Sequence, residues 1–193
     1  MFGIIWYILL LIATLIGLNI LLDYKKYGNK IFECFKKKNN DVDMKDLLIN
    51  IFKKEIRNKI LILDRGKDYF ITLTRYDIFL VQLVNDKINI VGSIKDERFK
   101  TRSKNMKEVK NPLTKFIQEI KLLLNKGIDI KPVIIKTNKE CNLALKDFDK
   151  RNIFTLGDFS YLLYKLQHAS FKYSEEEIEN KYNELKELLD GNN

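Results

Sequence analysis

The amino-acid sequence predicts an α+β fold in which a mixed sheet with an antiparallel meander is covered by helices and preceded by one transmembrane helix. Three observations lead to this prediction. A charge-free stretch opens the chain, four consecutive strand-like segments occupy its middle, and helix and strand patterns alternate after them. A chain of 193 residues with 46% hydrophobic residues has room for one globular domain of about 150 residues and an appendage.

The appendage is predicted at residues 1–23, where residues 2–22 carry no charge. A helix of that length, at about 1.5 Å per residue, spans about 30 Å, the thickness of a bilayer core. A signal peptide or a buried core helix are the alternatives, but no basic region precedes the stretch and no small-residue cleavage site follows it. Because lysines come after it, the positive-inside rule predicts a single-pass membrane protein with the N-terminus outside and the C-terminal domain cytoplasmic.

Residues 24–43 are predicted to form a basic juxtamembrane linker. Six lysines in it make membrane lipid an expected partner, because anionic headgroups attract such a cluster. These are Lys25, Lys26, Lys30, Lys36, Lys37 and Lys38. The whole chain has a net charge of +9, but its richness in Lys, Asn and Ile makes basicity weak evidence for nucleic acid. Two cysteines and one histidine disfavour a disulfide framework, a His–Cys zinc site and a serine triad.

The globular domain is expected over residues 44–170 and begins with a helix at residues 44–56, capped by Asp43. Four apolar segments follow, KILIL, YFITLT, IFLVQLV and KINIVGSI, and the short polar connections between the last three are typical of hairpins. These four strands predict the antiparallel meander. Residues 95–110 lose all periodicity, carry a net charge of +4 and are expected to form an exposed loop.

The second half alternates helices and strands. NPLTKFIQEIKLLLNKG is predicted as a helix because its proline suits the first turn and its final glycine the left-handed position after the last. The strand IKPVIIKT follows, then CNLALKDF as a short helical or irregular piece, and RNIFTL as a further strand. The capping-box spacings of Thr155 with Asp158 and of Ser174 with Glu177 predict the starts of two more helices. The last, within residues 171–193, is acidic and amphipathic, as is typical of a solvated helix.

In this order, the helix, four strands, basic loop, "NP" helix and strand resemble the nuclease-related domain, NERD, of the restriction-endonuclease-like superfamily. The resemblance covers about residues 44–166. YDIFLVQLVN resembles the family's strand pair around a Y-G-I-F-V-I-E-x-K-N core, and KNPLTKFIQEIKLLL resembles its N-P-x-x-Q helix. KPVIIKTN and RNIFTLGDFSYLL resemble the strand that follows and the closing strand and helix. The resemblance implies a restriction-endonuclease-like fold.

The resemblance also implies where a metal site would lie. Members of the family are expected to hold a divalent metal with an Asp at the start of one strand and a Glu on the next, with a Lys two residues after the Glu. In this sequence the Glu position is Gln82, the Lys position is Val84 and the Asp position is Tyr69, with Asp68 one residue away. The glutamine of the "NP" helix corresponds to Lys115.

These departures imply a nuclease fold whose metal site is dismantled, so no catalytic residue and no cofactor are expected. Gln82 keeps the size and hydrogen-bonding capacity of a glutamate without its charge, and Val84 cannot replace an ammonium group. Two alternatives stay open: Gln82 is an ordinary half-exposed strand residue, or neighbouring acids, with Asp68 as the main substitute, bind Mg²⁺ in a rearranged site. The acids are Asp64, Asp68, Asp77, Asp86, Asp96 and Glu97.

The function predicted from these features is a membrane-anchored, cytoplasmic, nuclease-related pseudoenzyme that binds nucleic acid or a protein partner. The candidate phosphate contacts share the basic loop with Phe99, a candidate stacking ring. They are Lys95, Arg98, Lys100, Arg102, Lys104, Lys107 and Lys110. The alternatives are an active Mg²⁺-dependent endonuclease with a rearranged site, and a structural or regulatory membrane protein.

Overall fold

The structure of the protein is a computed structural model that describes residues 6–7, 10–19, 22, 44–56, 59–84, 89–101, 107–138 and 141–191. Its larger sheet has the order β1-β2-β3-β7-β9. The strands are β1 (Ile60–Asp64), β2 (Tyr69–Thr74), β3 (Ile78–Val84), β7 (Lys131–Lys136) and β9 (Ile153–Thr155). β1, β2 and β3 are antiparallel neighbours, whereas β7 is parallel to both β3 and β9. The α+β class and the mixed sheet are therefore as predicted.

A second, four-stranded sheet has the order β6-β5-β4-β8. Its strands are β4 (Asn89–Gly92), β5 (Arg98–Thr101), β6 (Glu108–Lys110) and β8 (Asn142–Leu145). The predicted meander of four strands is thus wrong in one respect, because its fourth strand belongs to this other sheet. The predicted loop at residues 95–110 contains β5 and β6, and the segment CNLALKDF contains β8. These strands are three or four residues long, too short to show a clear period in the sequence.

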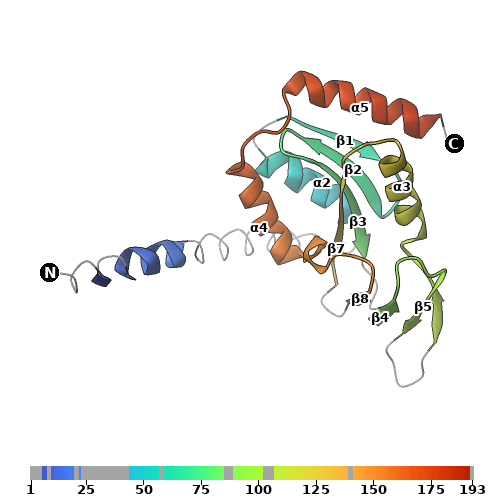
Figure 1. Cartoon of the computed structure of the whole chain (residues 1–193), viewed down its shortest axis with the longest axis horizontal. Coiled ribbons are helices and arrows are strands. Elements are labelled where there is room, and N and C mark those ends of the chain that lie inside the picture. The colour runs from blue at the N-terminus through green and yellow to red at the C-terminus, as the bar shows by residue number, and fades with distance from the viewer. Residues whose placement is uncertain are drawn as a thin grey trace.

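Helices cover both faces of the larger sheet (Figure 1). Helices α2 (Met44–Glu55) and α4 (Leu156–Gln167) pack on one face, and α3 (Thr114–Asn125) and α5 (Glu175–Asp190) pack on the other. Residues alternate between the faces along β3, because side chains of a strand point in turn to opposite sides. Leu80 joins the core under α3 and Val81 joins the core under α2. We call these the α3-side core and the α2-side core.

The predicted starts of the last two helices are confirmed. The hydroxyl of Thr155 accepts a hydrogen bond from the backbone N–H of Asp158, and Ser174 does the same with Glu177, so both helices begin with a complete capping box. Helix α3 begins differently. The Asn111 side chain accepts from the N–H of Leu113 at 2.8 Å and donates to two backbone carbonyls of the segment before β5. The asparagine of the "NP" pair therefore fixes the entry to α3.

The predicted transmembrane helix is wrong. In the described part of the chain, no helix has both the length and the apolar character that crossing a membrane requires. Residues 10–19 form a described helical segment near the N-terminus. Its residues are exposed and lie apart from the two sheets (Figure 1). The predicted localisation rested on that helix. The prediction of a single-pass membrane protein with the N-terminus outside and the C-terminal domain cytoplasmic is therefore wrong as well.

The predicted cap Asp43 and the predicted juxtamembrane linker, residues 24–43, lie outside the described residues. The six lysines expected at a membrane surface are part of that linker. They are Lys25, Lys26, Lys30, Lys36, Lys37 and Lys38.

Candidate functional site

Gln82 is buried in the middle of the larger sheet, with 6% of its surface exposed. Its side-chain amide nitrogen donates to the carbonyl oxygen of Asp68 at 3.2 Å and to that of Leu83 at 2.8 Å. The backbone N–H of Leu83 also donates to the Asp68 carbonyl, at 2.7 Å. Gln82 is therefore not a half-exposed strand residue. It ties β3 to the segment that leads into β2.

The acid positions considered with Gln82 do not converge on it. Gln82 is paired in register with Tyr69, which packs against the α3-side core. Asp64 is paired with Phe70, which belongs to the α2-side core, so Asp64 lies on the opposite face of the sheet. Asp68 is exposed and meets Gln82 through its backbone carbonyl. Val84 is buried and apolar, as expected for a position without an ammonium group.

Asp64 is held by Lys45 of helix α2. The Lys45 ammonium is buried and donates to both carboxylate oxygens of Asp64, at 2.8 and 2.7 Å, and to the carbonyl of Gly66 at 2.7 Å. Hydrogen bonding to Lys45 is the main cause that lowers the pKa of Asp64. The Asp64 carboxylate is thus engaged in fastening α2 to the turn after β1.

The remaining acids are dispersed. Asp77 is buried at the β2–β3 turn and paired with Lys131 and Lys172. Asp96 accepts from the backbone N–H of Ser93 at 2.9 Å, and Glu97 contributes its backbone carbonyl to Asn111. Asp86 lies outside the described residues. Within the described ranges, no three His, Cys, Asp or Glu side chains are grouped so that they could hold a metal ion.

Two positions aligned with the family site do line one cavity of about 300 Å³, which Tyr69 and Lys115 share with Glu119 and Arg65. Glu119 is buried on α3 and accepts from the Arg65 guanidinium at 2.8 Å. Burial, followed by the charge of Glu119 and a hydrogen bond to it, raises the pKa of Tyr69. The remaining lining residues are Gln118, Leu122 and Leu189.

The donor set of this cavity does not fit Mg²⁺. A magnesium site needs carboxylate and water oxygens in an octahedral arrangement. Glu119 supplies the cavity's one carboxylate among its lining residues, and Arg65 already neutralises it. Glu119 and Arg65 were missed by the sequence argument. The signal was present, because Glu119 lies three residues after Phe116 and four before Leu123, on the apolar face of the predicted helix.

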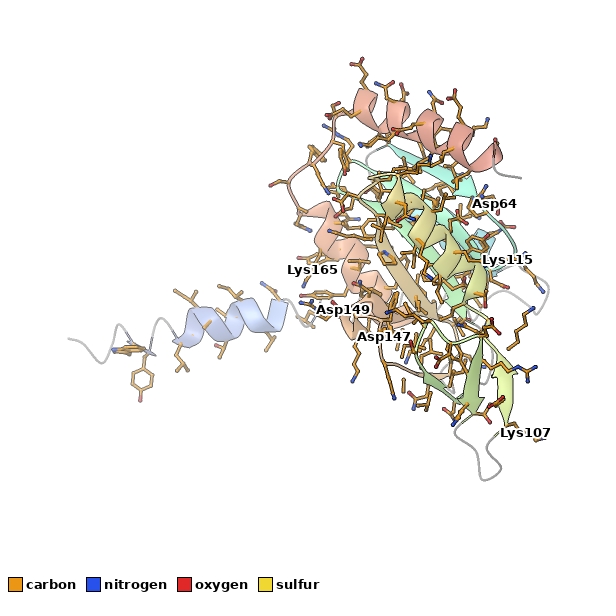
Figure 2. The ribbon with its side chains drawn as sticks, turned by 45° about the vertical axis from the view of Figure 1, so that its right-hand side comes forward. Asp64, Lys107, Lys115, Asp147, Asp149 and Lys165 are labelled. Carbon is orange, nitrogen blue, oxygen red and sulfur yellow. The ribbon has the colours of Figure 1, made fainter. Side chains whose placement is uncertain are left out.

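Three of the predicted phosphate contacts, Arg98, Lys100 and Lys110, form a basic face on the β5–β6 hairpin. Arg98 and Lys100 are exposed and alternate with buried Phe99, and Arg98 is paired in register with Lys110. The three basic side chains therefore share the outer face of the smaller sheet, which we call the basic hairpin face. Lys95 and Lys107 are exposed at its ends, and Figure 2 shows Lys107 far from Asp64 and Lys115. Arg102 and Lys104 lie outside the described residues.

Phe99 is not available as a stacking ring, and that prediction is wrong. The ring is fully buried in the α3-side core. It covers Gly92 of β4 so closely that a Cβ atom there would lie 2.8 Å from Phe99 Cδ1. The ring is turned inward by the same strand alternation that turns Arg98 and Lys100 outward.

No protein-family model, curated protein or solved structure matches the chain. The resemblance to the nuclease-related domain therefore stays a prediction that rests on the quoted motifs and their order.

Proposed function

We propose that this chain is a nucleic-acid-binding module built on a nuclease-related fold that does not cleave its ligand. The observation that carries the non-cleaving part of the proposal is the hydrogen bonding of Gln82, and the basic hairpin face carries the binding part. Both hydrogens of its amide group have backbone carbonyl acceptors, one at Asp68 and one at Leu83. A carboxylate has no hydrogen to donate at this place, so the position is built for an amide and not for a metal ligand.

The order of the elements supports a nuclease-related fold. Helix α2, the β1–β2–β3 meander, helix α3 and parallel strand β7 keep the order that the resemblance implies, whereas its fourth strand and basic loop belong to the smaller sheet. The strands β4 to β6 stand between β3 and α3 and carry the basic hairpin face. The ligand-binding surface and the former metal positions thus come from different sheets.

The basic hairpin face is suited to phosphate contacts that do not depend on base sequence. Arg98 and Lys100 are two residues apart on one strand, about 6.6 Å along it, and Lys110 lies on the adjacent strand. Glu108, which is paired in register with Lys100, is the acidic residue among the paired positions of β5 and β6. Its carboxylate oxygen lies 3.9 Å from Nη1 of Arg98. Since Phe99 is buried, affinity is expected to come from charge, with strong dependence on salt.

The proposal is tested by measuring the affinity of the full chain for a DNA duplex over a range of salt concentrations. The triple variant Arg98→Gln, Lys100→Gln, Lys110→Gln removes three contacts. The slope of log K against log salt should flatten by about 0.9 for each contact, or about 2.7 in all. A matched variant, Lys121→Gln with Lys126→Gln, neutralises exposed lysines elsewhere and should keep the slope. An unchanged slope in the triple variant, or no binding by the unaltered chain, would refute the interface.

Cleavage is tested separately. Plasmid DNA incubated with the full chain in Mg²⁺ or Mn²⁺ should remain uncut. Metal-dependent cutting that Asp68→Asn abolishes would instead establish a rearranged endonuclease site and overturn the non-cleaving part of the proposal.

A further inference from the structure

A second cavity, of about 360 Å³, lies on the α2-side face of the larger sheet, where β3, β7 and β9 begin. Its apolar wall consists of Phe79, Val133, Phe154, Leu162 and Leu166. None of these residues lines the first cavity, the one that Tyr69 and Lys115 share, and none belongs to the basic hairpin face. The volume lies at the lower end of the range of small-molecule sites, about 300–1,000 Å³.

The rim of this cavity combines two cations, one carboxylate and an amide. These are Lys131, Arg151, Asp149 and Asn152. Asp149 lies apart from Asp64 and Lys115 in the molecule (Figure 2).

The carboxylate of the rim is saturated. Asp149 accepts from the backbone N–H of Arg151 at 2.9 Å, from its Nε at 3.0 and 3.1 Å, and from its Nη2 at 2.7 Å. The guanidinium and the backbone N–H together hold the pKa of Asp149 below its usual value, so it stays ionised and acceptor-only. Nη1 of Arg151 has no acceptor among the described residues. The Arg151 side chain, which is 89% exposed at the rim, therefore keeps a donor for a ligand that reaches it there.

Lys131 offers a second donor. Its ammonium group is paired with Asp77, and its side chain is 57% exposed. Asp77 also accepts from Lys172 at 3.3 Å, so its charge is shared between two cations. An ammonium group carries three hydrogens, and the pairing with Asp77 leaves hydrogens of Lys131 for a ligand.

We propose that this cavity binds a small molecule with an aromatic or aliphatic body and one anionic group. The apolar wall takes the body, and the spare donors of Lys131 and Arg151 take the anion. Lys131 and Arg151 are each paired with a carboxylate, Asp77 and Asp149, so the anion is expected to bind through the N–H donors that these pairs leave over. This site is independent of the proposed nucleic-acid interface.

The test uses two fluorescent probes that differ by one group. Anilinonaphthalene sulfonate carries the anion, and N-phenyl-1-naphthylamine is the same body without it. Titration of the full chain should give saturable fluorescence enhancement with the anionic probe, at a Kd at least tenfold lower than with the neutral one. Equal affinities for the two probes would overturn the assignment of an anionic ligand.

The variant Lys131→Met should raise the Kd of the anionic probe about tenfold and leave that of the neutral probe within twofold. Lys172→Met is the matched control. It also removes an ammonium group that is paired with Asp77, but Lys172 does not line the cavity. It should change neither Kd. Equal effects of the two variants on the anionic probe would refute the role of Lys131.

The apolar wall is tested by filling the cavity. Leu162→Trp should weaken both probes at least tenfold, whereas Leu124→Trp, at an exposed position of α3, should not. If Leu162→Trp does not fold, Asn152→Trp narrows the mouth from a half-buried rim position and should have the same effect. Probe affinity that survives in whichever cavity variant folds would place the binding elsewhere and overturn the site.

Discussion

Replacing Gln82 by glutamate gives the most direct test of whether this position belongs to a metal site. The substitution keeps the size of the side chain and replaces the amide nitrogen by an oxygen. That oxygen would face the carbonyls of Asp68 and Leu83, which now accept at 3.2 and 2.8 Å. At neutral pH the variant has no hydrogen for either acceptor.

The cost can be worked from these contacts. Two hydrogen bonds at a net 0.5–1.5 kcal/mol each give a loss of about 1–3 kcal/mol. Burial beside two carbonyl oxygens also raises the pKa of the new carboxyl group, and each pKa unit adds about 1.4 kcal/mol to the cost of the charged form. We therefore expect Gln82→Glu to lower the free energy of unfolding by about 3 kcal/mol at pH 8.

The loss should depend on pH in a defined direction. The folded-state pKa of the new carboxyl is raised above its unfolded value of about 4.3. Below that value both states are protonated, and a neutral acid keeps one donor, so the loss shrinks to about 1 kcal/mol. As the pH rises through the folded-state pKa, the variant loses further stability relative to the unaltered chain.

The assay is urea unfolding of the unaltered chain and both variants at pH 4 and pH 8. Gln82→Met is the control, because it removes both hydrogen bonds without adding a charge and should show a loss independent of pH. Two results would refute the reasoning. One is a Gln82→Glu variant as stable as the unaltered chain at pH 8. The other is stabilisation of that variant alone by millimolar Mg²⁺, which would reveal metal ligands around position 82.

Three further predictions concern the surroundings. Asn111→Ala removes three side-chain hydrogen bonds, one buried and two partly buried, and should cost about 2–4 kcal/mol in urea unfolding, and a loss below 1 kcal/mol would contradict its role in starting α3. Glu119→Gln should lower the pKa of Tyr69 in an ultraviolet titration but not restore its usual value, because burial is the larger cause. Lys172→Met should raise the pKa of Asp129 toward 3.8 in an NMR titration, since Lys172 is the main cause of its depression. The ionised Asp129 carboxylate stabilises the folded state at pH values above 3.8. This stabilisation is lost as the pH falls through the folded-state pKa of Asp129. An unmoved Asp129 pKa would exclude this pairing in solution.

Features with a local cause were predictable from the sequence. The capping boxes at Thr155 and Ser174 need only residues three positions apart, and both helices begin where those pairs indicate. The apolar face of α3 follows from a repeat of three and four residues within one segment. The mixed sheet also followed, because a meander and a helix-separated strand have few ways to pair.

Features that depend on distant partners were not predictable in the same way. One of the two acceptors of Gln82, the Asp68 carbonyl, lies 14 residues earlier in the chain, and the partner of Asp64 is Lys45, 19 residues earlier on helix α2. Phe99 was expected to be exposed because lysines and arginines surround it. The pairing of Phe99 with Val109 across the hairpin turns the ring inward, and this register could not be read from either strand alone. The membrane prediction rested on hydropathy and length over residues 2–22 alone, and no helix of the described residues has both the length and the apolar character it required.

The place of Asp68 in the chain explains why it is a poor substitute for an acid at position 69. Tyr69 faces Gln82 across β2 and β3, and Phe70 faces the opposite core. Asp68 precedes β2, its side chain is exposed, and it meets Gln82 through its backbone carbonyl and not through its carboxylate. Strand alternation places Asp64 with Phe70 and not with Gln82. An acidic pair on the Gln82 face therefore needs a change at position 69 itself. The double variant Tyr69→Asp, Gln82→Glu should bind Mn²⁺ in calorimetry more tightly than Gln82→Glu alone. Equal binding by the two variants would refute the argument that an acid at position 69 completes a metal site with position 82.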